Sequence, residues 1–129
     1  MKVNTEFLKQ EIEITQKEQN IISNYIEKMT RKEYCQVLEN TKNLELFNAL
    51  SVLRENSINW YNFKKESNIL EVNSNFGEIT GYLCSHAKKV VLTQPALKKC
   101  EAISKRYEDI SNLEIFAGEI RRDSFVRKI

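Results

Sequence analysis

The first half of the chain carries apolar residues at helical spacing. From residue 5 to residue 29 they recur mostly three, four and seven positions apart, which is typical of an amphipathic helix that needs a partner surface. Thr30 and Glu33 then match a capping box, with Thr30 as N-cap and Glu33 at the third helical position, and predict a second helix after a tight turn. The apolar positions of the first helix are Phe7, Leu8, Ile12, Ile21, Ile22, Tyr25, Ile26 and Met29.

A third helical stretch is expected over residues 43–63. Its leucines lie among polar residues at helical spacing, and a break is expected near Asn56 and Ser57. Three aromatic residues at its end are expected to pack the helices against the rest of the domain: Trp60, Tyr61 and Phe63. Residues 1–63 are therefore predicted to form a helical extension.

The periodicity changes after residue 63. Short runs rich in branched residues, each bounded by polar or turn residues, predict strands over 69–72, 89–93 and 113–117. Two helical segments separate them, at 77–85 and 96–107. Strands that alternate with helices need crossover connections, so residues 64–129 are predicted to fold as a β-α-β-α-β unit with a parallel sheet and right-handed crossovers. The fold class is α/β.

Composition and charge narrow the function classes. The 129 residues suit one domain, and 20 basic residues against 18 acidic ones are interspersed, so the net charge of +2 argues against nucleic-acid binding. Only the stretch RRDSFVRK at 121–128 is locally basic, and a solvated face and a phosphate or RNA contact both stay open. No run approaches the roughly 20 apolar residues that span a bilayer. A soluble protein without membrane contact is expected.

Three cysteines, at positions 35, 84 and 100, lie far apart and form no CxxC pair. Their odd number does not suit a secreted disulfide framework, so they are interpreted as reduced thiols of a cytoplasmic protein. Cys84 and Cys100 fall at helical positions that suit buried small residues. The single histidine, His86, lies at the end of a predicted helix, where the helix dipole favours a cation.

The stretch NILEVNSNFGEITGYL, residues 68–83, has the order of a nucleotide-binding turn. Glu71 ends the first strand and Gly77 opens the helix, while Asn73 and Asn75 stand where glycines would be expected. Asparagine is the residue that best replaces glycine at positive φ, so the turn can persist. The second strand ends near Gln94, where an acid commonly holds ribose hydroxyls.

These motifs resemble a known family. Residues from about 50 to 120 are similar to the front half of class I S-adenosylmethionine-dependent methyltransferases, most of all to bacterial methyltransferase-domain proteins, some associated with glycosyltransferases, and more distantly to ribosomal-RNA adenine dimethyltransferases. The family's first motif is an acid followed by alternate glycines; here the acid and the last glycine are retained. The resemblance implies a partial Rossmann-like sheet and S-adenosylmethionine as cofactor. The implied cofactor-binding residues are Glu71, Asn73, Asn75, Gly77, Gln94 at the ribose and Glu119 near the adenine.

Each implied contact has a simpler alternative. The asparagines and Gly77 also suit an ordinary strand-to-helix turn, Glu71 could cap the following helix or face water, and Gln94 could lie in a surface turn. In the family a fourth strand lies beside the first, and the chain stops before it, so the first strand is expected to be an open edge that the N-terminal helices, a second copy or a partner protein covers. No catalytic residue is assigned.

Two functions are the main candidates, and a third stays open. One is a methyltransferase-like domain, a fragment or degenerate relative with weak or no activity by itself. The other is a non-catalytic protein-interaction or oligomerisation module on the same scaffold. An RNA-binding fragment that uses residues 121–128 is a third reading.

Overall fold

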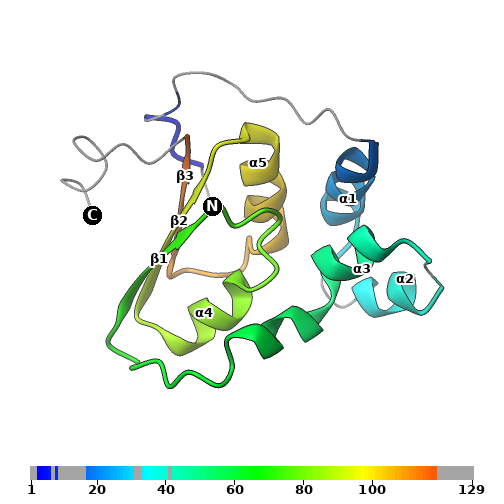
Figure 1. The fold of residues 1–129 in the computed structure, drawn as a ribbon. Coiled ribbons are helices and arrows are strands. Elements are labelled where there is room, and N and C mark those ends of the chain that lie inside the picture. The colour runs from blue at the N-terminus through cyan, green and yellow to red at the C-terminus, as the bar shows by residue number, and fades with distance from the viewer. Residues whose placement is uncertain (1–2, 7, 9–16, 31–32, 41, 119–129) are drawn as a thin grey trace.

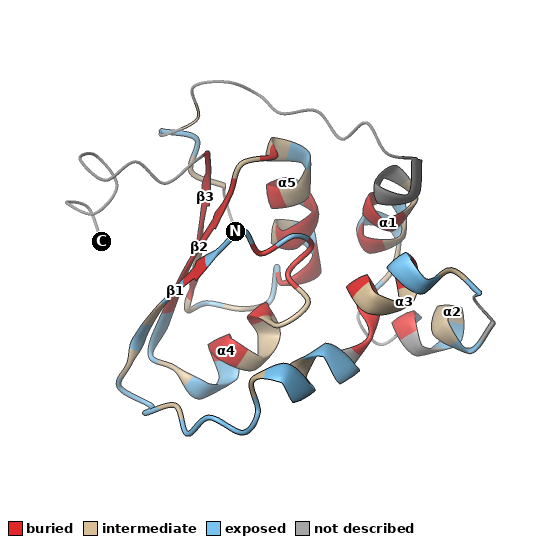
Figure 2. Ribbon diagram, in the orientation of Figure 1, coloured by how far each residue is buried: buried red, intermediate tan, exposed pale blue. Residues whose placement is uncertain are grey.

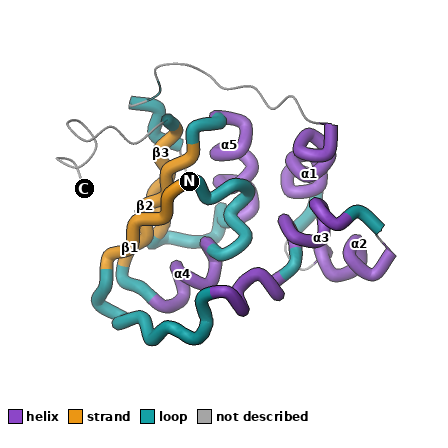
Figure 3. Tube along the Cα trace, viewed as in Figure 1, coloured by secondary structure: helices purple, strands orange, loops and turns teal. Residues whose placement is uncertain are grey.

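The computed structural model describes residues 3–6, 8, 17–30, 33–40 and 42–118 (Figure 1). Helices occupy the first part of this chain and an alternating strand-helix unit occupies the second (Figure 3). The elements in chain order are α1 (Lys17–Lys28), α2 (Tyr34–Asn40), α3 (Leu44–Leu50), the 3₁₀ helix η2 (Val52–Ser57), β1 (Asn68–Val72), α4 (Thr80–His86), β2 (Lys89–Gln94), α5 (Leu97–Arg106) and β3 (Leu113–Ala117). The predicted α/β class, with N-terminal helices and a partial Rossmann-like sheet, is confirmed.

The three strands form one parallel sheet in the order β1-β2-β3. Ile69 pairs with Val90, and Val90 pairs with Leu113, so side chains of the same parity share a face across all strands. Both crossover helices, α4 and α5, pack on the face that carries Val90, Leu92 and Ile115, all fully buried. The sheet and this helical layer make the main core, which is red in Figure 2.

The N-terminal helices form a further layer against α5 (Figure 1). α1 contacts both α5 and α3. Four positions of the apolar stripe predicted for the first helix face this interface: Ile22, Tyr25, Ile26 and Met29. Leu8 packs instead against the core of the sheet. One residue of the cluster comes from the β1–α4 turn, because Phe76 inserts its fully buried ring among the helices. The cluster consists of Ile22, Ile26, Tyr34, Leu46, Ala49, Leu50, Phe76 and Ala102.

The start of the first helix was predicted too early. Asn4 pairs with β3 instead. The N–H of Asn4 donates to the carbonyl of Ile115 at 2.8 Å, and the N–H of Ala117 donates to the carbonyl of Asn4 at 2.9 Å. The side chain of Asn4 also accepts from the N–H of Glu6, which favours a turn over a helix. Residues 9–16 of the predicted helix lie outside the described part, and α1 begins at Lys17.

One of the two hydrogen bonds of the predicted capping box is present, the bond to the side chain of Glu33. The carboxylate of Glu33 accepts from the N–H of Thr30 at 3.2 Å, and the N–H of Glu33 donates to the Thr30 carbonyl at 3.0 Å. These bonds hold the chain before α2.

The expected break near residues 56 and 57 is confirmed, because η2 ends at Ser57. The stretch is also interrupted earlier, at Ser51, whose hydroxyl accepts from the N–H of Leu53 and starts η2. The expected packing of the aromatic residues is wrong for two of them. Trp60 and Tyr61 do not pack against the sheet: they are 75% and 54% exposed. Phe63 does contact the core that α4 and the sheet share. Within the described ranges, no helix is both long enough and apolar enough to cross a membrane.

Candidate functional site

The β1–α4 turn has the backbone expected of a glycine-rich turn. Asn73 and Asn75 adopt φ values of 53° and 52°, and Gly77 adopts 76°. Asparagine tolerates this left-handed region better than other residues with a side chain, so the predicted backbone is confirmed. At Gly77 an added Cβ would lie 3.0 Å from the ring of Tyr107 and 3.2 Å from Thr80 Oγ1, which explains why the last glycine is needed.

The two asparagines differ in what their side chains do. Asn75 links the turn to one crossover helix: its Oδ1 accepts from Lys99 Nζ of α5 at 2.8 Å, and its Nδ2 donates to Glu78 Oε1, within the β1–α4 turn, at 2.8 Å. The side chain of Asn73 is exposed, while its N–H donates to the Thr93 carbonyl at 3.1 Å and anchors the turn to β2. Asn75 is therefore a structural bridge, and Asn73 presents its amide to solvent.

Glu71 is buried at the end of β1, with 7% exposure. Its Oε2 accepts from Thr80 Oγ1 at 2.7 Å, so the carboxyl is tied to the first residue of α4. Burial raises the pKa of Glu71 to about 7; the Thr80 bond opposes this shift, and the charge of Glu78 adds to it. Two alternatives to cofactor contact were that Glu71 caps the following helix or faces water. The buried bond to Thr80 favours the first of them.

Gln94 is buried, so the surface-turn interpretation is wrong. Its Oε1 accepts from the N–H of Ala96 at 3.2 Å, and its Nε2 lies 3.4 Å from the carbonyl of Asn75, a long hydrogen bond. The Gln94 carbonyl accepts from the N–H of Gly118 at 3.0 Å, which places the ends of β2 and β3 side by side. The structure thus brings Gln94 to the turn, as predicted; Glu119 lies outside the described residues.

The sequence did not reveal that Arg106 and Tyr107 bond the backbone of the turn. Arg106 Nη1 donates to the carbonyls of Ala49 at 2.7 Å and Phe76 at 3.0 Å, and the hydroxyl of Tyr107 donates to the carbonyl of Gly77. Both side chains are buried. The partners of Arg106 lie 57 and 30 positions away in sequence, so no local pattern could have revealed them.

The cysteine and histidine predictions fit a structural role. Cys84 and Cys100 are buried, and burial raises the pKa of the Cys100 thiol to about 12, so this thiol is unreactive at neutral pH. His86 is exposed, stacks on Tyr82 and forms hydrogen bonds through Nδ1. Among the described residues, no group of three histidine, cysteine or acidic side chains is placed to hold a metal ion.

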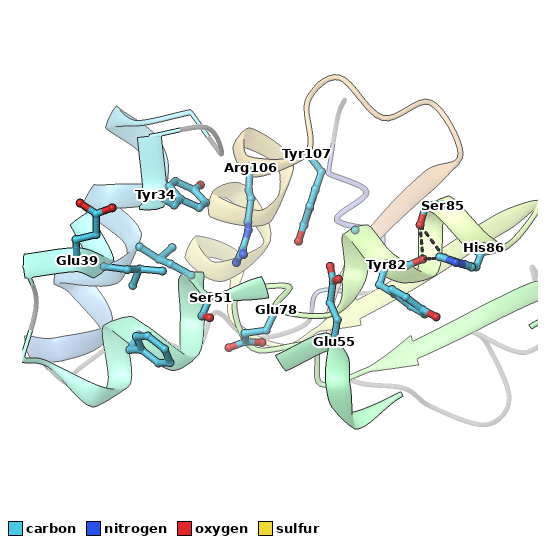
Figure 4. A pocket seen from close by; sticks show the side chains of 14 residues that line it. Tyr34, Glu39, Ser51, Glu55, Glu78, Tyr82, Ser85, His86, Arg106 and Tyr107 are labelled. Atoms are coloured by element: carbon cyan, nitrogen blue, oxygen red, sulfur yellow. Dashed lines mark hydrogen bonds between the residues drawn. The ribbon is translucent and has the colours of Figure 1, made fainter. Parts of the chain in front are cut away.

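A cavity of about 750 Å³ lies on the other side of the turn, between α4 and the N-terminal helices (Figure 4). Its lining includes Glu78, Arg106 and Tyr107, the residues that contact the turn, and does not include Glu71 or Gln94. The turn therefore separates the strand ends from this second space.

No model of a known protein family matches the chain, and no curated protein sequence matches it. Solved structures do. The chain superposes with a TM-score of 0.52, at 12% identity, on phosphoethanolamine N-methyltransferase 1 of Haemonchus contortus, determined with phosphoethanolamine and S-adenosylhomocysteine; the match covers 78% of this chain and 22% of that one. The chain has the fold of part of a class I methyltransferase. A dimethyladenosine transferase from Plasmodium falciparum also matches, with a TM-score of 0.45 and 24% identity over 65% of this chain and 29% of that chain.

The left-handed backbone of Asn73 gives a stability test. We expect Asn73→Gly to be more stable than Asn73→Ala by about 1 kcal/mol, because alanine is strained in the left-handed region and glycine is not. Asn68, exposed in β1 at ordinary strand geometry, is the matched control, and there glycine is expected to be the less stable substitution. Urea unfolding measures all four variants. An alanine at position 73 as stable as glycine would contradict the turn geometry.

The buried carboxyl of Glu71 predicts a pH dependence of folding. Its pKa is about 7 in the folded chain against 4.5 as the ordinary value, so the folded state binds the proton more tightly. The resulting stability is fully present below about pH 4.5, falls as the pH rises, and is lost above about pH 7; the total is on the order of 3 kcal/mol. We expect Glu71→Gln to abolish this loss in urea unfolding between pH 4.5 and 7.5, whereas Glu66→Gln, at an exposed carboxyl, retains it. Parallel curves for wild type and Glu71→Gln would refute the assignment.

Proposed function

We propose that this chain is the cofactor-binding part of a class I methyltransferase fold, a fragment or degenerate relative that binds S-adenosylmethionine or S-adenosylhomocysteine weakly by itself. The observation that carries the proposal is the left-handed turn at Asn73, Asn75 and Gly77, placed between a parallel strand and its crossover helix. The chain spans only 22% of the methyltransferase from Haemonchus contortus, so an acceptor and catalytic residues belong to whatever completes the fold. Bound cofactor supplies an electrophilic methyl group, and the enzyme chiefly positions it.

The residues at the turn fit such a ligand in part. The hydroxyl of Ser74 is buried in the turn with no hydrogen-bond partner among the described residues, and a polar ligand group or a water would satisfy it. Asn73 presents an exposed amide, and Glu71, just before the turn, is hydrogen-bonded to Thr80, just after it. Gln94 is less suited, because its amide already bonds the start of α5 and the turn. We therefore expect weak affinity.

Calorimetric titration with S-adenosylhomocysteine tests the cofactor directly. We expect measurable heat at about millimolar ligand. Gln94→Glu places a carboxylate where the family holds the ribose, and it is expected to improve affinity by about 1 kcal/mol, because a charged acceptor binds a hydroxyl more strongly than a neutral amide. Gln36→Glu, on the exposed surface of α2, is the matched control and should change nothing. Absence of heat at millimolar ligand from a folded sample would overturn the proposal for this chain.

A second candidate, a module that binds a partner or a second copy through the sheet edge, is favoured by the state of β1. The outer edge of β3 is paired with Asn4, whereas β1 is the opposite end of the sheet. Leu70 and Val72 on this strand are 44% and 50% exposed, unusual for branched apolar residues in a sheet.

Backbone geometry makes this edge available for pairing. The N–H of Asn73 donates to the carbonyl of Thr93 in β2. Successive residues of a parallel strand direct their N–H and C=O groups to opposite sides. The N–H and C=O groups of Asn68, Leu70 and Val72 therefore point away from β2. Such a row of outward N–H and C=O groups is a template for another strand.

Light scattering after size exclusion tests the edge. If the edge binds a second copy, we expect a mass above that of one chain at high concentration, and we expect Leu70→Lys to restore the monomer, because a charge blocks strand addition. Leu53→Lys, at an exposed leucine of η2, is the matched control and should leave the mass unchanged. A strictly monomeric wild type would count against self-association.

Other expectations remain predictions. The division at residues 63 and 64, a cytoplasmic location, a bacterial origin, an association with glycosyltransferases and RNA contact through 121–128 belong to this group. The basic segment itself lies outside the described residues.

A further inference from the structure

The cavity behind the turn has two charged walls. In Figure 4, Arg106 and Tyr107 enter the space from one side, and Glu55 and Glu78 face them from the other. Its volume of about 750 Å³ lies in the range of small-molecule sites. The lining does not include Glu71 or Gln94 at the strand ends, so the cavity is a different space from the proposed cofactor site.

Arg106 brings a buried positive charge to this cavity. The residue is 7% exposed, and its described contacts are two backbone carbonyls and the faces of the Tyr34 and Tyr107 rings. Its Nε–H has no acceptor, and no ion pair joins it to a carboxylate in the described part of the chain. A buried guanidinium without a counter-charge is costly, so an anionic group would be stabilised beside it.

The opposite wall carries negative charge. Glu55, half-buried in η2, takes part in no ion pair or side-chain hydrogen bond among the described residues. Glu78 also lines the cavity and accepts a bond from Asn75. A cationic group placed between these carboxylates and away from Arg106 would be attracted to this wall.

Apolar side chains also line the cavity. Leu38, Phe47, Leu50 and Tyr82 contribute to the lining, and the ring of Tyr107 packs against Gly81 of α4. Such walls favour an apolar or aromatic body and contribute through the area they remove from water.

We propose that this cavity binds a small dipolar molecule, with an anionic group at Arg106, a cationic group at Glu55 and an aromatic-sized apolar body between them. Ligand binding would also act on the β1–α4 turn, because residues that line the cavity bond it. Glu78 accepts from Asn75, Arg106 donates to the carbonyl of Phe76, and Tyr107 donates to the carbonyl of Gly77. A ligand that draws on these side chains shifts the turn with it.

Three probes that share a phenylethyl group test the charges. Calorimetric titrations use phenylalanine, 2-phenylethylamine, which lacks the carboxylate, and 3-phenylpropanoate, which lacks the ammonium. We expect phenylalanine to bind about tenfold more tightly than either, because each charge-assisted contact adds to affinity. A single-charge probe that binds as tightly as phenylalanine would overturn the dipolar ligand, and so would no binding of any probe at about 10 mM.

Amide resonances of the three glycines locate the bound probe. Gly81 lines the cavity and Gly77 is bonded to Tyr107, whereas Gly118 follows β3. We expect phenylalanine to shift Gly81 and Gly77 and to leave Gly118 unchanged; a shift confined to Gly118 would contradict the site.

A substitution at Glu55 tests the negative wall alone and leaves Arg106 in place. Glu55→Gln is expected to weaken phenylalanine and 2-phenylethylamine by several-fold and to leave 3-phenylpropanoate unaffected, because only the first two carry a cation. Glu101→Gln, on the exposed side of α5, is the matched control. Equal binding of phenylalanine to wild type and Glu55→Gln would overturn the role of this wall.

Discussion

The guanidinium of Arg106 joins the N-terminal helices to the strand-helix unit. One nitrogen, Nη1, bonds the carbonyl of Ala49 at the end of α3 and the carbonyl of Phe76 in the β1–α4 turn. Bonds from a charged donor in a buried setting are stronger than neutral ones, and a buried charge without them would be costly. The position of the turn relative to the helices therefore depends on this side chain.

The turn is also part of the core. Phe76 fills the helical cluster, and Gly77 leaves room for Tyr107. This explains how two asparagines can replace glycines here: the neighbouring contacts maintain the left-handed backbone, and Asn75 adds bonds to Glu78 of the same turn and to Lys99 of α5. The turn is thus stabilised by contacts within the protein itself. That stabilisation preserves the fold, and it leaves fewer groups available to a ligand.

The sheet is asymmetric in a way that bears on both proposed functions. Asn4 occupies the edge at β3, and no described residue pairs with the outer edge of β1, which carries exposed apolar side chains. A further strand, a second copy or another protein would satisfy the same backbone groups. The cofactor proposal and the interaction proposal therefore differ in what covers β1, while the turn and the core stay the same in either case.

Local information in the sequence determined most of the secondary structure. The branched runs at 69–72, 89–93 and 113–117 match the observed strands to within one residue at either end, because strand periodicity and turn residues act over short distances. Positive φ at Asn73 and Asn75 was predictable for the same reason. The residues that hold the turn were not, and neither were the exposure of Trp60, the pairing of Asn4 or the burial of Gln94. Each of these depends on which distant segments meet, as Arg106 meets Ala49 across 57 positions, and only the packed tertiary structure decides that.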